Sequence, residues 1–209
     1  MALFHVATIT PSKNEFIGDW VRSQAWGCAA DAEVEVIGGY RFDDPEGKVG
    51  METHIVKAGG VALHVPMTYR DAPLDGADDA LICTIEHSAL GTRWVYDGVR
   101  DPRLVVSLAG VTMTGQGEAL GMFVHHDRWH IAPMPVRIEG GGWGLERVPV
   151  DGFELDHDGE DGAVLRNDRF ELTVFRRPVA GPRPPIALTA TWPDQVSPVV
   201  LATVTELSA

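Results

Sequence analysis

The stretch VGMETHIVKAGGVALHVPMTY, Val49–Tyr69, decides the fold. Apolar side chains alternate with other residues in both halves, and AGG separates the halves. Successive side chains of a strand point to opposite faces, so this period of two predicts two strands. The short glycine turn predicts that they form an antiparallel hairpin. The residues expected to share a face are Val49, Met51, Thr53 and Ile55 in the first strand and Val61, Leu63, Val65 and Met67 in the second, with His64 on the opposite face.

The alternation continues on both sides of this hairpin. Residues 33–42, EVEVIGGYRF, precede it, and the DDPEGK turn joins them to it. Residues 80–88 and 92–98, ALICTIEHS and TRWVYDG, follow it after a polar loop. Short strands joined by short turns predict an antiparallel meander. One face of the first strand is expected to carry Val34, Val36, Tyr40 and Phe42, and Pro66 predicts an edge position or a bulge for its strand.

A period of 3.6 predicts one helix before the meander. Its start is open between two signals, because Pro11 suits a first helical position whereas Ser12 and Glu15 have the spacing of a capping box. Gly27 is placed to end it. Its apolar face consists of Phe16, Ile17, Trp20 and Val21.

A second helix is predicted after the meander, with Asp101 as its cap, Pro102 as its first residue and Gly115 and Gly117 closing it. The rest of the chain is expected to be almost wholly β. The fold class is therefore α+β, with an N-terminal helix packed on an antiparallel meander sheet and a mostly-β C-terminal half. The predicted domains are residues 1–114 and residues 115–209. The expected strands are residues 2–10 before the first helix and residues 119–125, 134–140, 153–158, 163–177, 186–192 and 199–207 after the second, with a turn at Asn167–Asp168.

Composition excludes several classes of partner. The 209 residues include 30 acids and 17 bases, which gives a net charge of −13. Nucleic acids and anionic membranes attract clustered cations, so neither is an expected partner. No apolar run is long enough to span a bilayer, and the N-terminus lacks a basic start followed by an apolar run. Cys28 and Cys83 have no metal-ligand spacing, so they are interpreted as free thiols of a cytoplasmic protein.

The HHDRWH segment is the sharpest cluster of candidate ligands. His125, His126, Asp127 and His130 offer three imidazoles and a carboxylate, which zinc and similar ions prefer. No single regular conformation aligns all four, because His126 and His130 share a helical face whereas His125 and Asp127 share a strand face. The alternative is a polar hairpin tip between two strands. These four residues are the metal-site candidates, and no other cofactor is expected.

No catalytic residues are predicted. Glu86 and His87 are adjacent on an expected strand and point to opposite faces, so they do not form one acid–base pair. Asp97 and Asp101 lie at a strand-to-helix junction, where carboxylates commonly cap. No G-x-S-x-G motif is present. The isolated histidines, interpreted as structural, are His5, His54 and His64, and the pair Trp94 and Tyr96 is expected to belong to the core.

Three phrases resemble a known family: YRFDDPEGKVGMETHIV, HVPMTYRDAPLDGA and IEHSALGTRWVYDGVRDP. Over about residues 1–114 they are similar to the N-terminal cap domain of actinobacterial maltokinases, and closer still to small standalone cap-like proteins. The resemblance implies a helix on an antiparallel sheet. Maltokinases add kinase lobes that use ATP and magnesium to phosphorylate maltose, through an H-G-D-x-H…N loop and a D-F-E-like motif.

This chain has neither kinase motif, so the resemblance carries over architecture and no catalytic residue. WGCAAD, residues 26–31, also lacks the basic residue of the family pattern. The first hypothesis is therefore a non-catalytic cytoplasmic protein that binds a partner protein or a small carbohydrate-like ligand, with a link to α-glucan or maltose 1-phosphate metabolism implied by the resemblance. The alternatives are a metal-binding protein or enzyme that uses the HHDRWH cluster, and an accessory subunit of a sugar kinase. The oligomeric state stays open.

Overall fold

The computed structural model describes residues 2–3, 7–142 and 148–208. Among these residues strands greatly outnumber helices, so this part of the chain is mostly β. The predicted α+β class fits it broadly. The elements in chain order are β1 (Ala2–Leu3), β2 (Ile9–Thr10), α1 (Lys13–Ser23), β3 (Val34–Phe42), β4 (Gly50–Ala58), β5 (Val61–Arg70), the 3-10 turn η1 (Asp78–Ala80), β6 (Leu81–His87), β7 (Gly91–Asp97), the 3-10 turn η2 (Gly98–Arg100), α2 (Pro102–Thr114), β8 (Gly121–His125), β9 (Arg128–Ile131), β10 (Arg137–Gly140), β11 (Glu154–Asp158), β12 (Ala163–Arg166), β13 (Phe170–Val179), β14 (Ala187–Trp192) and β15 (Gln195–Glu206).

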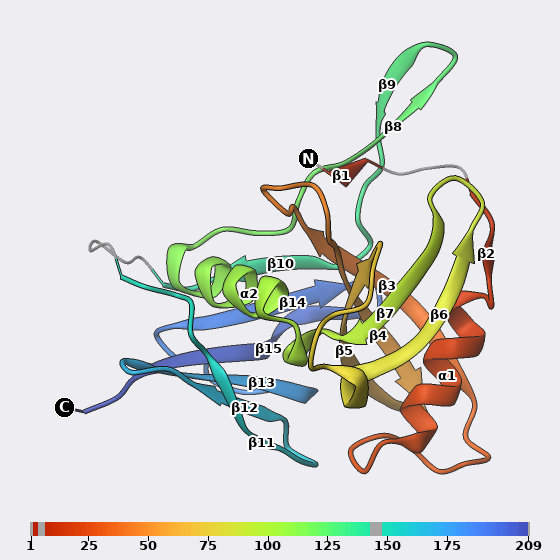
Figure 1. Ribbon diagram of the computed structural model, residues 1–209. Coiled ribbons are helices and arrows are strands. Elements are labelled where there is room, and N and C mark those ends of the chain that lie inside the picture. The colour runs from red at the N-terminus through yellow and green to blue at the C-terminus, as the bar shows by residue number, and fades with distance from the viewer. Residues whose placement is uncertain (1, 4–6, 143–147, 209) are drawn as a thin grey trace.

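The strands form three sheets (Figure 1). The N-terminal sheet has the order β2-β6-β7-β5-β4-β3, and the C-terminal sheet has the order β10-β14-β15-β13-β12-β11. Both are antiparallel throughout. The small third sheet consists of the β8–β9 hairpin with β1 parallel to β8. This hairpin projects from the rest of the molecule in Figure 1.

The hairpin predicted from residues 49–69 is confirmed as β4 and β5, which pair without interruption from Gly50 opposite Tyr69 to Ala58 opposite Val61. Gly59 and Gly60 form its two-residue turn with φ values of 55° and 87°. Positive φ at both positions matches the right-handed twist of the strands, and glycine adopts it without steric cost.

The edge position predicted from Pro66 is wrong. Strand β5 lies between β4 and β7, but its pairing with β7 begins only at Met67. Pro66 is opposite Thr53 of β4 and has no partner in the β7 ladder. The missing N–H of proline is therefore tolerated inside the sheet, because the ladder on that side starts one residue later.

Both faces of the β4–β5 hairpin are buried, and they belong to different hydrophobic clusters. One face contributes Val56, Leu63 and Val65 to a cluster that also contains Phe16 and Ile17 of α1. The opposite face contributes Met51 and Ile55 to the largest cluster, which includes the C-terminal sheet. Met51 and Ile55 thus share a face, as the alternation predicts, and so do Leu63 and Val65.

A β-bulge overturns the prediction that Val34, Val36, Tyr40 and Phe42 share one face. The register between β3 and β4 shifts between Val36 and Gly38. Val34 and Val36 pack in the cluster of α1, whereas Tyr40 and Phe42 belong to the cluster of the C-terminal sheet. The extra residue of a bulge reverses the alternation beyond it, so one strand supplies both clusters.

The first helix has one of its two predicted starts and ends earlier than predicted. It begins at Lys13 behind the N-cap Ser12, whose backbone N–H donates to Glu15 Oε2 at 2.8 Å, so the capping box decides its start and Pro11 lies outside it. It ends at Ser23. Gly27 lies beyond the helix, where the backbone passes too close to α1 for a side chain. A Cβ there would lie 1.8 Å from the carbonyl oxygen of Val21.

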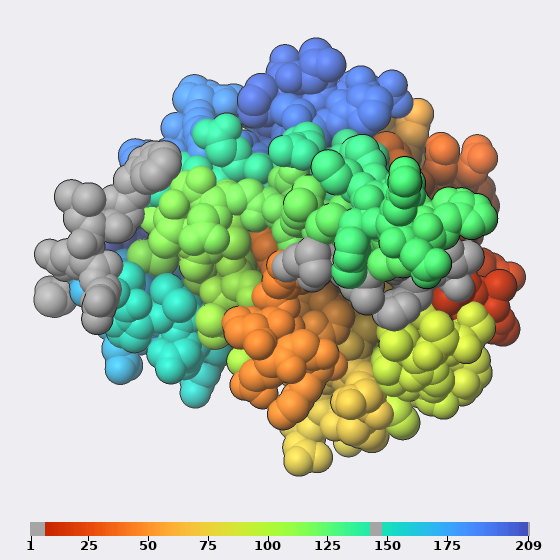
Figure 2. Space-filling view, turned by 90° about the horizontal axis from the view of Figure 1, so that it is seen from above, coloured from red at the N-terminus to blue at the C-terminus, as the bar shows by residue number. Residues whose placement is uncertain are grey.

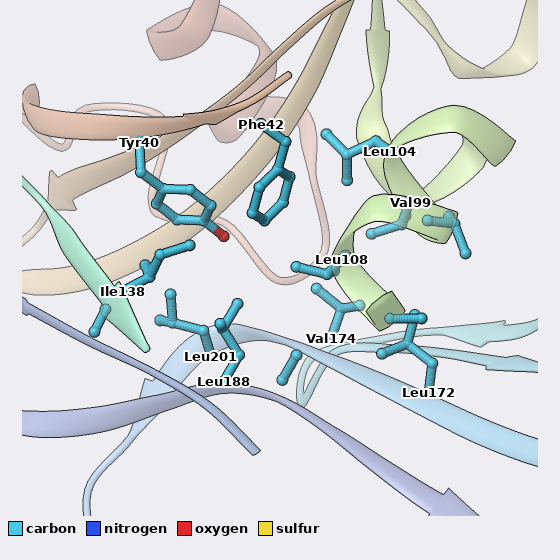
Figure 3. Packing of buried hydrophobic residues seen from close by; sticks show 14 of the residues in the cluster. Tyr40, Phe42, Val99, Leu104, Leu108, Ile138, Leu172, Val174, Leu188 and Leu201 are labelled. Atoms are coloured by element: carbon cyan, nitrogen blue, oxygen red, sulfur yellow. The ribbon is translucent and has the colours of Figure 1, made fainter. Parts of the chain in front are cut away.

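Helix α2 is confirmed where it was predicted, with the side chain of Asp101 accepting from Arg103 N at 3.0 Å and Pro102 as its first residue. Gly115 ends it with a φ of 68°. Within the described residues, no helix is long and apolar enough to cross a membrane. Leu104 and Leu108 of α2 are fully buried. They lie between the two large sheets, where they face Leu172 and Val174 (Figure 3).

The C-terminal strands follow the predicted pattern, with one addition. An unpredicted strand, β9, completes a hairpin with β8, and the turn at Asn167–Asp168 is confirmed, since Asn167 Oδ1 accepts from Phe170 N at 2.7 Å. The strand predicted over residues 2–10 is present only at its ends, as β1 and β2; residues 4–6 lie outside the described residues.

The largest cluster contains residues from both sides of the boundary predicted at residue 114. In Figure 3, Tyr40 and Phe42 point from β3 toward Leu188 and Leu201 of the C-terminal sheet, and Ile138 of β10 closes one side. The boundary stays a prediction. Because all of these side chains are buried in one cluster, we expect the residues on its two sides to unfold together.

The guanidinium of Arg176, on β13, is fully buried. Its Nη1 and Nη2 donate to Asp97 Oδ1 and Oδ2 at 3.1 and 2.5 Å, and Nη2 also donates to Asp158 Oδ2 at 2.7 Å. Its Cζ lies 4.6 Å from the ring centroid of Trp26 and 5.9 Å from that of Trp20. One buried side chain therefore joins β7, β11 and the end of the α1 region through ionic and cation–π contacts.

Substitution of Arg176 tests this junction. We expect Arg176→Ala to lower the free energy of unfolding by about 3–5 kcal/mol, because it leaves the buried carboxylate of Asp97 without its partner. Urea titration followed by tryptophan fluorescence measures the change. The matched control is Arg177→Ala, since Arg177 is the next residue but is exposed. Equal losses of stability in the two variants would contradict the role assigned to Arg176.

Candidate binding site

A cavity of about 370 Å³ lies at the end of the N-terminal sheet where α1 begins. It is lined by the first residue of α1, the β3–β4 turn, and residues of β3 to β7. A second cavity of about 400 Å³ lies between the end of α2 and β10, and its titratable lining side chains are Arg137 and Glu139. The first cavity is the candidate site because more polar and titratable side chains line it than line the second. They include Lys13, Arg41, Glu52, Tyr69, His87 and Arg93.

Strand register explains how these residues meet. Arg41 of β3 is directly opposite Glu52 of β4, so both point to the same face. Tyr69 is two residues beyond Met67, which is opposite Glu52, and therefore lies on that face too. Arg93 follows by the same alternation, two residues before Val95, the partner of Tyr69.

Lys13 and Glu52 form the central ion pair of the cavity. Lys13 Nζ donates to both carboxylate oxygens of Glu52, at 2.8 and 2.7 Å. Burial favours the neutral acid, but the charges of His54, Lys13 and Arg41 outweigh burial and hold the pKa of Glu52 at about 2. Glu52 is therefore a carboxylate throughout the physiological range.

His54 lies behind this pair. Its Nε2 is 3.3 Å from the hydroxyl of Tyr69 and 3.9 Å from Glu52 Oε2. Burial lowers the pKa of His54 to about 4, although Glu52 opposes that shift. The imidazole is neutral at pH 7, so Lys13 and Arg41 are the cations that keep Glu52 ionised at that pH. Burial also raises the pKa of Tyr69, which remains a phenol.

The residues of the family-like phrases form the scaffold beside the cavity. Asp101 is fully buried and accepts from Thr68 Oγ1 at 2.6 Å and from Arg70 Nε and Nη2 at 2.7 Å each. The hydroxyl of Tyr96 accepts from Leu74 N at 2.9 Å. The prediction that Asp101 caps a helix is confirmed, and Asp97 likewise accepts from Val99 N at 3.4 Å.

Glu86 and His87 diverge, as predicted from their adjacent positions on a strand. Glu86 Oε1 accepts from Thr92 Oγ1 at 2.8 Å, whereas His87 lines the cavity. The Nδ1 of His87 accepts from the backbone N–H groups of Ala89 and Leu90, each at 3.2 Å. Neither residue is placed to activate the other.

The structural role predicted for His64 is also observed. Its Nε2 is 2.9 Å from the hydroxyl of Tyr40 and its Nδ1 is 3.0 Å from the carbonyl oxygen of Phe175 on β13. Burial lowers the pKa of His64 to about 3. His64 therefore connects the N-terminal and C-terminal sheets as a neutral imidazole. His5 lies outside the described residues.

Tyr96 is buried and Trp94 is partly buried, and both pack in a small cluster with Ala77 and Ala80. The two cysteines are free and half-buried, in agreement with their interpretation. Burial raises the pKa of Cys83 to about 11, which keeps it a thiol at neutral pH.

The four metal-site candidates lie at the tip of the β8–β9 hairpin. His126 and Asp127 form its turn with φ values of 48° and 57°, and the ring centroid of His125 is 4.0 Å from that of His126 and 5.9 Å from that of His130. The structure thus gathers three imidazoles, which neither a regular helix nor a regular strand does.

Within residues 2–3, 7–142 and 148–208, no group of three or more His, Cys, Asp or Glu side chains is arranged to hold a metal ion. The metal site at His125, His126, Asp127 and His130 remains a hypothesis. Stoichiometric metal in the purified protein that is lost in both His126→Ala and His130→Ala would establish it, and its absence would reject it.

The cavity was not predicted from the sequence, because its residues come from six separate segments. One signal was present: Arg41 and Glu52 are charged residues on strands whose other face is apolar, and they occupy opposing positions. Recognising the pair required the β3–β4 register, which the bulge after Val36 alters.

The lowered pKa values of His54 and His64 predict acid sensitivity. In the unfolded chain each imidazole binds a proton near pH 6.5, but in the fold only near pH 4 and pH 3. The unfolded state therefore binds more protons below pH 6.5, and stability falls as the pH falls from 6.5 toward 4, by up to about 1.4 kcal/mol per pH unit for each histidine. Protonation of Glu52 in the unfolded chain adds to this loss below pH 4.5.

Urea midpoints measured between pH 7 and pH 5 test this prediction. We expect His64→Gln to be less stable than the parent at pH 7 and to show a shallower dependence on pH, because one of the two titrating groups is gone. A His64→Gln variant with the same pH slope as the parent would contradict it.

Part of the chain matches a known protein family. Residues 20–101 match the family model of the maltokinase N-terminal cap domain, a segment that includes most of the N-terminal sheet and less than half of the chain. No curated protein matches the chain. The resemblance predicted over about residues 1–114 is thus confirmed over residues 20–101. Over residues 20–101 this chain is therefore similar to the maltokinase N-terminal cap domain.

Proposed function

We propose that the protein is a non-catalytic, cytoplasmic cap-like module that binds a small carbohydrate-like ligand in the cavity between Lys13 and Arg93. The family match supports a maltokinase-related module. The observation that supports a small ligand is the cavity at one end of the matched sheet. The link to α-glucan or maltose 1-phosphate metabolism is part of the proposal and is supported by the family match alone.

The lining of the cavity suits a polyol. Arg93 and Lys13 donate hydrogen bonds, Glu52 accepts them, and Tyr69 and Ile85 add apolar surface. Small-molecule sites combine such apolar walls with a few placed polar groups. A sugar presents hydroxyl groups around apolar C–H faces, so its surface matches both parts of this lining.

Three engaged carboxylates of the matched segment support a binding role over a catalytic one. Glu52 is engaged by Lys13, Asp97 by Arg176, and Asp101 by Thr68 and Arg70. A general acid or base must exchange a proton near neutral pH, and the pKa of Glu52 lies near 2. These carboxylates therefore act as structural acceptors.

Calorimetric titration with maltose and maltotriose tests the proposal. We expect saturable binding that Arg93→Ala weakens at least about fivefold, because a hydrogen bond to a charged donor is lost. Arg128→Ala is the matched control, since Arg128 is exposed in the β8–β9 hairpin and does not line the cavity. Absence of saturable binding of both maltose and maltotriose would reject a neutral sugar of this kind as the ligand, and transfer of phosphate from ATP to maltose by the purified chain would reject the non-catalytic role.

Binding of a partner protein is the second candidate function, with an accessory subunit of a sugar kinase as one form. The β8–β9 hairpin favours it, because Val124, Trp129 and Ile131 are 48%, 57% and 63% exposed. Val124 is opposite Trp129, so these side chains share a face of the hairpin, which spreads over the outer surface in Figure 2. A kinase subunit that co-purifies with the parent chain and is lost with Trp129→Ser would support this function; its retention by the variant would contradict it.

A further inference from the structure

The floor of the candidate cavity carries more positive than negative side chains. Lys13, Arg41, Lys48 and Arg93 line the cavity, together with the three carboxylates Asp43, Asp44 and Glu52. The chain as a whole has a net charge of −13. A concave site whose charge opposes that of the surrounding protein focuses its field on ligands of the opposite sign, which here are anions.

Arg93 is the basic residue of the lining that most favours an anionic ligand. Its side chain is partly buried, and its Nη1 donates to the carbonyl oxygen of Thr92 at 2.9 Å. Among the residues that the structure describes, no carboxylate lies within 4.0 Å of its guanidinium. A partly buried cation without a counter-charge has lost part of its solvation, so an anionic ligand would stabilise it.

The neighbouring carboxylates are already engaged. Glu52 accepts two hydrogen bonds from Lys13. Asp44, on the rim, accepts from the backbone N–H groups of Lys48 and Val49 at 2.8 and 2.9 Å. Asp43, the other carboxylate on the rim, also has an interaction partner. The planar fork of a guanidinium fits the two oxygens of a carboxylate or a phosphate.

We propose that this cavity binds the anionic group, phosphate or carboxylate, of a small ligand, with Arg93 as the residue that contacts it directly. Lys13 and Arg41 contribute the surrounding positive potential. This inference rests on the proposed function and deepens it, because the carbohydrate-like ligand is then an acidic or phosphorylated sugar. Recognition is assigned to the charge of the ligand, and the sugar hydroxyl groups add contacts to the remaining polar lining.

Isothermal titration at constant ionic strength tests the proposal with inorganic phosphate, glucose 1-phosphate, glucuronate and glucose. We expect the three anions to bind more tightly than glucose. Arg93→Gln should weaken binding of each anion about tenfold or more, and Arg93→Lys, which keeps the charge but loses the fork, should weaken it less. Arg128→Gln changes the net charge by the same amount at the hairpin and should leave anion binding unchanged.

The outcomes separate this proposal from the function on which it rests. Anion binding that is unaffected by Arg93→Gln, or weakened equally by Arg128→Gln, overturns the site. Binding of maltose without binding of any anion overturns the inference and leaves the proposed function standing. Binding of the anions but not of maltose supports the inference and rejects a neutral sugar as ligand. Circular dichroism checks that both Arg93 variants are folded. If Arg93→Gln is not folded, the comparison of Arg93→Lys with the parent tests the site alone.

Discussion

The buried guanidinium of Arg176 is the interaction on which the rest of the structure depends. It stands between the two large sheets, on β13, and its counter-charge Asp97 is at the end of β7. Burial raises the pKa of Asp97 and is opposed by Arg176, while Asp97 and Asp158 outweigh burial and raise the pKa of Arg176. The guanidinium therefore stays charged, and a charge so far from water is tolerated only while its partners stay in place. Separation of the sheets removes them.

The same contact joins the segment matched by the family model to the rest of the chain. The match ends at residue 101, but Asp97 inside it is paired with Arg176 outside it. Tyr40 and Ile55 of the matched segment are likewise buried against side chains of the C-terminal sheet. The cap-like segment is therefore not covered by its own residues on this face. Its other face, which packs with α1, ends at the cavity of Lys13, Glu52 and Arg93, where we propose that the ligand binds.

Local signals in the sequence predicted local structure well. The Gly59–Gly60 turn, the alternation around it and the Asp101–Pro102 helix start depend on neighbouring residues, so they were visible in the chain. The bulge after Val36 was not, because a strand that keeps its alternation and a strand that reverses it have equally apolar sequences. Arg176 lies in a strand whose alternate residues are apolar, so only the packing of β13 on β5 shows that it is buried. The cavity depends on register in the same way.

Native-state hydrogen exchange tests the central claim most directly, namely that the segments on either side of residue 114 form one cooperative unit around Arg176. We predict that the slowest amides of β5 and β13 exchange through the same opening, with equal free energies and equal dependence on denaturant, because their shared cluster is exposed in one step. Exchange of the β13 amides through a lower-energy opening that leaves β5 protected would contradict the account.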